Sequence, residues 1–177
     1  LTVQSDSLSV LAQEYINAGD YESAIPIIRQ CAALEKKALG ANSVWYANSL
    51  GLYVNCLLYA GHDLKEVMQA TAEPLAIYTY NNMYNGMANM YYLIGDVYYN
   101  MPDYEKAFQA YGQSKDYYRK DGDELSAYSM LASMAECKNL LGKASESLPL
   151  ALEAAEFFAQ SPDAGKECYA YGKTIST

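Results

Sequence analysis

The stretch of sequence that decides the fold runs from Tyr91 to Tyr111 and reads YYLIGDVYYNMPDYEKAFQAY. Apolar and aromatic side chains recur there at the i, i+3, i+4, i+7 spacing of an amphipathic helix, and the turn at Pro102 interrupts the pattern. Asp103 follows the turn, where its carboxylate can accept hydrogen bonds from the first backbone amides of a new helix. The stretch therefore predicts two helices joined by a short turn, which pack antiparallel.

The same helix–turn–helix pattern recurs along the whole chain of 177 residues. Its turns are marked by Gly19, Gly61, Pro102 and Gly142, which follow one another at nearly equal intervals. A fixed period of about 41 residues is typical of a repeat protein, in which one helix pair cannot bury both of its faces alone. We therefore expect the pairs to stack side by side around a continuous core.

The periodicity predicts nine helices and no strand. They span roughly residues 5–18, 21–39, 43–60, 64–80, 84–100, 104–119, 124–141, 144–159 and 162–174. Gly40 is suited to end the second helix and Ser43 to cap the third. We expect a single solenoid domain over residues 1–177, with repeats at approximately 5–39, 43–80, 84–119 and 124–159 and a terminal helix at 162–174.

The repeats share a bulky residue, an apolar–small pair, an aromatic residue, the turn, a second aromatic residue and an alanine. In the first repeat these are Leu8, Leu11, Ala12, Tyr15, Gly19, Tyr21 and Ala24, and in the third they are Tyr91, Ile94, Gly95, Tyr98, Pro102, Tyr104 and Ala107. These positions resemble the tetratricopeptide repeat (TPR) family. The second and fourth repeats match less completely, because Asp63-Leu64 replaces the aromatic residue after the second turn.

The resemblance implies an all-α, right-handed superhelix of four TPR-like helix pairs with a C-terminal capping helix. In that family the first helix of each pair lines a concave groove, and small residues such as Gly95 lie where two helix axes approach closely. The period of about 41 residues exceeds the usual 34 of the family. In this respect the chain partly resembles the longer-period variant of kinesin light chains.

Charge and composition argue against several classes of function. The chain has 12 Lys and Arg against 21 Asp and Glu, a net charge of −9, so a nucleic-acid partner is not expected. His62 is the only histidine, and the four cysteines are dispersed, so we expect no metal, no cofactor and no catalysis, and interpret the cysteines as small buried residues. The apolar runs are too short for a membrane span. The compartment stays open, with the cytoplasm slightly favoured and export still allowed because the chain begins without Met.

Polar and tyrosine side chains are predicted to line the groove at the positions of the first helices that do not pack. These candidate ligand-binding residues are Gln13, Asn17, Asn48, Asn55, Tyr59, Asn89, Tyr92, Asp96, Tyr99 and Glu136. Asn amides both donate to and accept from a peptide backbone, and Tyr offers flat apolar area with a hydroxyl at low entropy cost. The pattern predicts a groove for an extended or helical polypeptide, neutral or basic rather than acidic because Asp96 and Glu136 lie in it.

Three interpretations of function remain open at this point. The first is a protein-interaction scaffold that binds a partner in the groove. The second is a sensory or regulatory segment of a larger multidomain signalling protein, linked to a kinase or a protease. The third is self-association into a homo-oligomer, because the ends of a solenoid leave an apolar face open.

Overall fold

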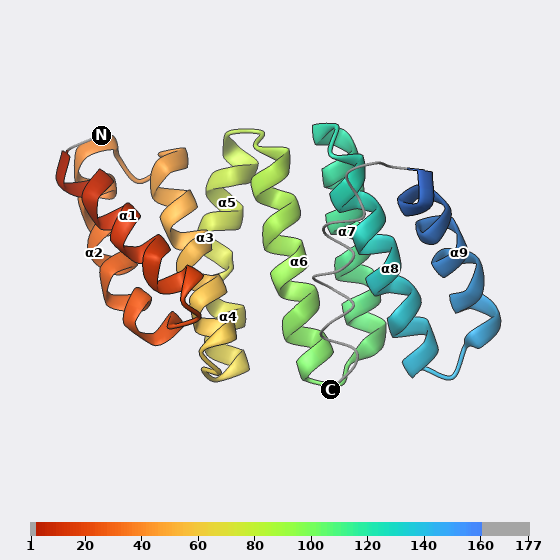
Figure 1. Cartoon of the computed structure of the whole chain (residues 1–177). Helices are drawn as coiled ribbons and strands as arrows, with labels where there is room; N and C mark the ends of the chain where they lie inside the picture. The colour runs from red at the N-terminus through yellow and green to blue at the C-terminus, as the bar shows by residue number, and fades with distance from the viewer. Residues whose placement is uncertain (1–2, 161–177) are drawn as a thin grey trace.

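The computed structural model of the chain describes residues 3–160, and every regular element in that range is an α-helix. The helices are α1 (Val3–Asn17), α2 (Tyr21–Leu39), α3 (Val44–Tyr59), α4 (Leu64–Ala70), α5 (Ala72–Tyr80), α6 (Tyr84–Asn100), α7 (Tyr104–Asp121), α8 (Glu124–Leu140) and α9 (Ala144–Gln160). They form a row that runs from α1 and α2 at one end to α9 at the other (Figure 1). The prediction of an all-α chain is confirmed for the described residues.

Neighbouring helices in the sequence pack on one another, as the short connections require. The row consists of four pairs, in which α1, α3, α6 and α8 are the first helices and α2, α4 with α5, α7 and α9 follow them. The expected terminal helix at 162–174 lies outside the described residues.

The helix expected over residues 64–80 is interrupted, and that part of the prediction is wrong. Helix α4 ends at Ala70 and α5 begins at Ala72. Pro74 causes the break, since it has no N–H to donate to the carbonyl of Ala70 and its ring crowds that turn of the helix. The hydroxyl of Thr71 donates to the carbonyl of Met68 at 2.7 Å, which satisfies one acceptor at the break.

The helix ends follow the capping residues of the sequence, with one exception. Asp20 accepts a hydrogen bond from the Ser23 amide at 3.1 Å, and Asp103 from the Lys106 amide at 3.3 Å. Gly40 ends α2 with φ near +91°, a conformation that favours glycine. Ser43 is at the predicted N-cap position of α3, but its side chain makes no capping hydrogen bond, so that prediction is confirmed in position only.

Most of the apolar positions predicted to pack are buried. Ala12, Val54, Leu57 and Ala107 are inaccessible or nearly so. Leu11 is 40% exposed, because α1 is the first helix of the row and packs chiefly on α2. The apolar pattern thus predicts burial well inside the row and less well at its end.

Two glycines allow tyrosine rings to lie directly on the backbone of α6. A Cβ atom added at Gly95 would lie 2.5 Å from the ring of Tyr111 on α7. A Cβ atom at Gly86 would overlap the ring of Tyr78 on α5 in the same way. The close packing expected at Gly95 is therefore present, and α6 is held in this way by both of its neighbours.

We predict that Gly95→Ala and Gly86→Ala each lower the free energy of unfolding by roughly 1–3 kcal/mol, because the added methyl group overlaps an aromatic ring in a packed core. Gly112→Ala in α7 is the matched control. Its Cβ atom would meet nothing nearer than the Met134 methyl group at 3.7 Å, so we expect a gain of about 0.5–1 kcal/mol from helix propensity. Urea unfolding followed by far-ultraviolet circular dichroism measures all three. Similar shifts for Gly95 and Gly112 would contradict the packing described here.

Candidate functional site

Five of the predicted site residues form a continuous surface across three first helices. The hydroxyls of Tyr59 on α3 and Tyr92 on α6 lie 3.2 Å apart. Further along α6, the hydroxyl of Tyr99 donates to Glu136 Oε1 on α8 at 2.7 Å. Asp96 lies between Tyr92 and Tyr99 in the same helix. We call the surface of α3, α6 and α8 that carries these side chains the first-helix face.

Two asparagines of this face accept the same hydrogen bond in successive repeats. The hydroxyl of Tyr78 donates to Asn48 Oδ1 at 2.9 Å, and that of Tyr118 donates to Asn89 Oδ1 at 2.6 Å. Both tyrosine side chains are buried, and burial raises the pKa of Tyr78 to about 12. The amide nitrogen of Asn89 also donates to Asn85 Oδ1 at 2.9 Å. These hydrogen bonds fix the orientation of the amides of the first-helix face from the core side.

Asp96 is the centre of a group of tyrosine hydroxyls. The hydroxyl of Tyr111 donates to Asp96 Oδ1 at 2.7 Å, and the hydroxyls of Tyr59 and Tyr92 also hydrogen-bond to the carboxylate. Burial raises the pKa of Asp96 to about 6, and the three hydrogen bonds offset only part of that effect. The carboxylate thus lies partly buried and without a basic side chain beside it in residues 3–160.

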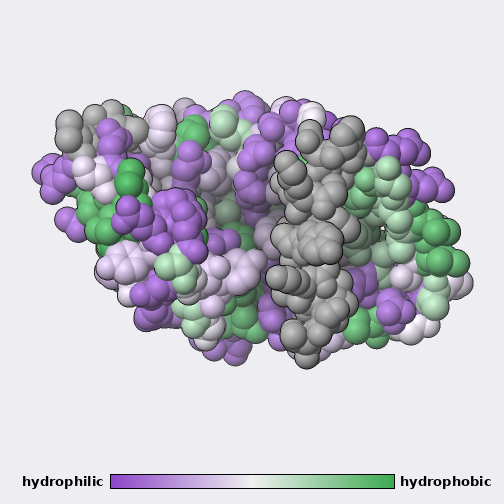
Figure 2. Space-filling model, in the orientation of Figure 1, coloured by the Kyte–Doolittle hydropathy of each residue, from purple (hydrophilic) through white to green (hydrophobic). Residues whose placement is uncertain are grey.

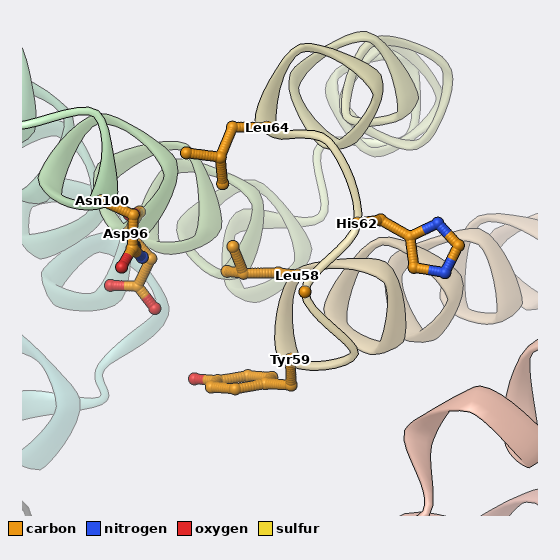
Figure 3. Close-up of a pocket in the computed structure, with 7 residues that line it drawn as sticks. Leu58, Tyr59, His62, Leu64, Asp96 and Asn100 are labelled. Atoms are coloured by element: carbon orange, nitrogen blue, oxygen red, sulfur yellow. Dashed lines mark hydrogen bonds between the residues drawn. The ribbon is translucent and has the colours of Figure 1, made fainter.

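An open cleft of about 480 Å³ adjoins this carboxylate. It is lined by Leu58, Tyr59, Gly61, His62, Leu64, Asp96 and Asn100. The side chains of Asp96 and Asn100 lie together on one side of the cleft, and the Tyr59 hydroxyl points toward them (Figure 3). The cleft therefore brings the C-terminal ends of α3 and α6 together.

His62 points away from Asp96, toward the other side of the cleft (Figure 3). Its Nε2 atom lies 3.1 Å from Glu22, and its Nδ1 atom lies 3.7 Å from Glu66. The hydrogen bond with Glu22 is the main cause of the raised pKa of His62. The His62 side chain is 30% exposed.

The remaining predicted residues have different surroundings. Asn55 is half-buried on α3, in the interval between Asn48 and Tyr59. Gln13 and Asn17 on α1 are exposed and hydrogen-bond to each other at 2.8 Å. Neither of these two belongs to the continuous surface from α3 to α8.

The tyrosines of the second helices were not among the predicted site residues. The amides and the carboxylate of the first-helix face are held from the core side by the hydroxyls of Tyr78, Tyr111 and Tyr118. The available signal was the spacing, since Asn48 and Asn89 lie one repeat apart in the sequence, as do Tyr78 and Tyr118.

The described cysteines do not have the surroundings of nucleophiles. Three cysteines are buried free thiols, and burial raises the pKa of Cys56 to about 11 and that of Cys137 to about 12, opposite to what a nucleophile needs. Cys168 lies outside the described residues. Within residues 3–160 no group of three His, Cys, Asp or Glu side chains is placed to hold a metal ion. None of the helices in that range combines the length and the hydrophobicity that a membrane span requires.

Comparison with known proteins agrees with the fold. A family model described as soluble NSF attachment protein, SNAP, matches residues 6–162. Nearly identical TPR-like repeats of a kinesin-light-chain-type protein of Podosopora anserina have a TM-score of 0.72 at 16% identity, covering 91% of this chain and 79% of that one. BtubC (BKLC) of P. vanneervenii has a TM-score of 0.77 at 13% identity, covering 88% of this chain and 63% of that one. No curated protein matches significantly. The expected TPR-like solenoid is confirmed, and the matching family is one that the repeat pattern did not predict.

We predict that Asp96→Asn stabilises the protein above pH 6. The pKa of Asp96 is about 6 in the folded chain against an ordinary value of 3.8, so the native state binds the proton more tightly and stability falls as pH rises from about 4 to about 6. The neutral amide avoids this cost, at most about 3 kcal/mol at 1.36 kcal/mol per pKa unit, and its oxygen still accepts from Tyr111. Tyr59, Tyr92, Tyr111 and Cys137 of α8 face this carboxylate.

Urea unfolding near pH 8 and near pH 5 measures the effect, which should be larger at the higher pH. Asp116→Asn is the control, because it removes the same charge from an exposed position on α7. A gain for Asp96→Asn that is independent of pH would contradict the assignment.

Proposed function

The chain belongs to the soluble NSF attachment protein (SNAP) family, and we propose that its first-helix face binds an extended or helical segment of a partner polypeptide in a concave groove. Proteins of this family bind other proteins and are typically non-catalytic. The single observation that carries the proposal is the continuity of the polar and tyrosine side chains from Tyr59 on α3 to Glu136 on α8.

The side chains of this face suit a polypeptide ligand. Tyr59 is 48% exposed and offers a flat ring with a hydroxyl, while Asn55 offers both a donor and an acceptor to a backbone. The carboxylates of Asp96 and Glu136 favour a neutral or basic segment over an acidic one. The family name denotes attachment to NSF, which makes NSF the first partner to test.

The repeat length supports a relation in architecture to the long-period TPR variant. The long period of this sequence agrees with the similarity of fold to kinesin-light-chain-type repeats. That similarity concerns the fold, and the cargo of those proteins is not transferred to this chain.

A second candidate function, self-association, is supported by the apolar surface near the end of the row. Leu148 and Leu152 on α9 are 59% and 53% exposed, and Leu140 on α8 is 45% exposed. Hydrophobic residues gather at the right-hand end of the molecule in the view of Figure 2, where α9 lies. A second copy of the chain that packs on this surface would bury these leucines.

We predict that Asn55→Ala with Asn89→Ala weakens partner binding by about 1–3 kcal/mol, through lost hydrogen bonds to the ligand. The measurement is capture of partners, NSF among them, from a lysate of the native organism, read by mass spectrometry. Asn89 also accepts from Tyr118, so the double variant should lose about 1 kcal/mol of stability and keep its helical spectrum.

The matched control is Gln30→Ala with Gln109→Ala, two exposed amides on the second helices α2 and α7. A partner that is lost with the first-helix variant and kept with the control supports the proposal. A partner that both variants keep equally would place the binding surface elsewhere.

For self-association, we expect the mass in solution to rise with protein concentration and to return to 19.6 kDa, the mass of one chain, in Leu148→Glu with Leu152→Glu. Burying two charges in an apolar contact is strongly unfavourable. Light scattering after size exclusion measures both proteins. A wild-type mass that stays at one chain over the whole concentration range would exclude this function.

A further inference from the structure

We infer that the cleft between the C-terminal ends of α3 and α6 binds one basic side chain, an arginine or a lysine, of the partner polypeptide. The inference rests on the proposed function, because it assigns the chemistry of one ligand residue to one place on the first-helix face. The cleft contains Asp96 and Asn100 of α6 together with Leu58 and Tyr59 of α3. Three features support it, namely the carboxylate, the hydrogen-bonding groups and the helix ends.

Within residues 3–160, Asp96 lacks the cationic partner that several other carboxylates have. Glu73, Asp103 and Glu146 each have a lysine ammonium within 3.1 Å. Within residues 3–160 the partners of Asp96 are tyrosine hydroxyls. A carboxylate accepts about four hydrogen bonds, and the three hydroxyls leave room for one more donor. A cationic donor would supply the missing opposite charge.

The polar groups of Asp96 and Asn100 that face the cleft are hydrogen-bond acceptors. The hydroxyls of Tyr59, Tyr92 and Tyr111 hydrogen-bond to Asp96, and those of Tyr59 and Tyr92 also lie 3.2 Å from each other. The amide nitrogen of Asn100 donates to the backbone carbonyl of Asp96 at 2.8 Å, so its amide oxygen is the atom that remains for a ligand. Arginine and lysine side chains carry donors only, and they match such a lining.

The backbone adds negative potential at the same place. Leu58 and Tyr59 are the last two residues of α3, and Asn100 is the last residue of α6, so two helix C-termini meet at the cleft. Each C-terminus carries a partial negative charge of roughly half an electron. The N-terminus of α4 is also near, but Asp63 already accepts from its amides at 2.9 and 3.3 Å. The sum of these fields favours a cation.

The other titratable group of the cleft does not compete for this role. His62 interacts with Glu22 and Glu66 on the side away from Asp96 (Figure 3). Leu58 and Leu64 provide apolar area for the aliphatic stem of the incoming side chain. A single long basic side chain can therefore satisfy the polar and the apolar parts of the lining together.

The test is a titration of the isotope-labelled chain of 177 residues with Nα-acetyl-arginine amide, followed by backbone amide resonances at about 0.15 M ionic strength. We expect the largest shifts at Tyr59, Gly61, Asp96 and Asn100, with a dissociation constant of about 1–10 mM. The lysine analogue should shift the same resonances, whereas the neutral isostere Nα-acetyl-citrulline amide should not. Asp96→Asn should weaken binding of the arginine probe about tenfold, and Asp116→Asn should leave it unchanged.

Equal shifts with citrulline, equal affinity of Asp96→Asn, or shifts spread evenly over the acidic surface would each overturn the inference. The result is independent of the proposed function, because the probe needs no partner. If capture of the partner depends on Asn55 and Asn89 while the arginine probe does not bind at Asp96, the groove stands and the basic-residue site falls. If the probe binds and capture is unaffected by the asparagine variant, the site stands and the proposed groove falls.

Discussion

The structure depends on one kind of contact, in which a tyrosine of a second helix crosses the core and ends at the first-helix face. Tyr111 shows both halves of it, because its ring lies on the backbone at Gly95 and its hydroxyl donates to Asp96 one residue later. Tyr78 does the same with Gly86 and Asn48. The ring sets how closely two helices approach, and the hydroxyl sets the orientation of a polar side chain on the surface. Packing and surface chemistry are therefore determined together.

This arrangement explains why three buried positions of the second helices carry tyrosine and not phenylalanine, in a chain that has 19 Tyr and only 3 Phe. A phenylalanine would fill the same space in the core, but the acceptor at the face would lose its donor. Buried hydroxyls need a partner, and each partner here is a side chain of the first-helix face. The tyrosines thus connect the interior of the row to the surface that we propose as the binding site.

Sequence periodicity predicted the helices because amphipathic spacing and aspartate caps act locally. It missed the break at Thr71, since the pattern of apolar residues continues through Pro74 and only the absent amide interrupts the helix. The stripe of Asn48, Asn89 and Asp96 was predicted from spacing on single helices. Their tyrosine donors lie 15 to 30 residues further along the chain, so these pairs follow from helix packing, which a single helix does not reveal. The family was missed for a related reason, because the TPR-like positions are packing positions that different families with this fold share.

The pairs of a tyrosine hydroxyl and its side-chain acceptor also limit which substitutions this sequence can tolerate during evolution. An exchange of Tyr118 for phenylalanine would change the volume of the core very little, yet it would remove the hydrogen bond that fixes the amide of Asn89. A change of Asn89 to an apolar residue would remove the acceptor of the Tyr118 hydroxyl. Each substitution alone is disfavoured, whereas the two together are tolerated. The two positions are therefore expected to change together. In an alignment of relatives such a pair would be visible as covariation between two residues 29 positions apart, carried by an atom pair 2.6 Å apart.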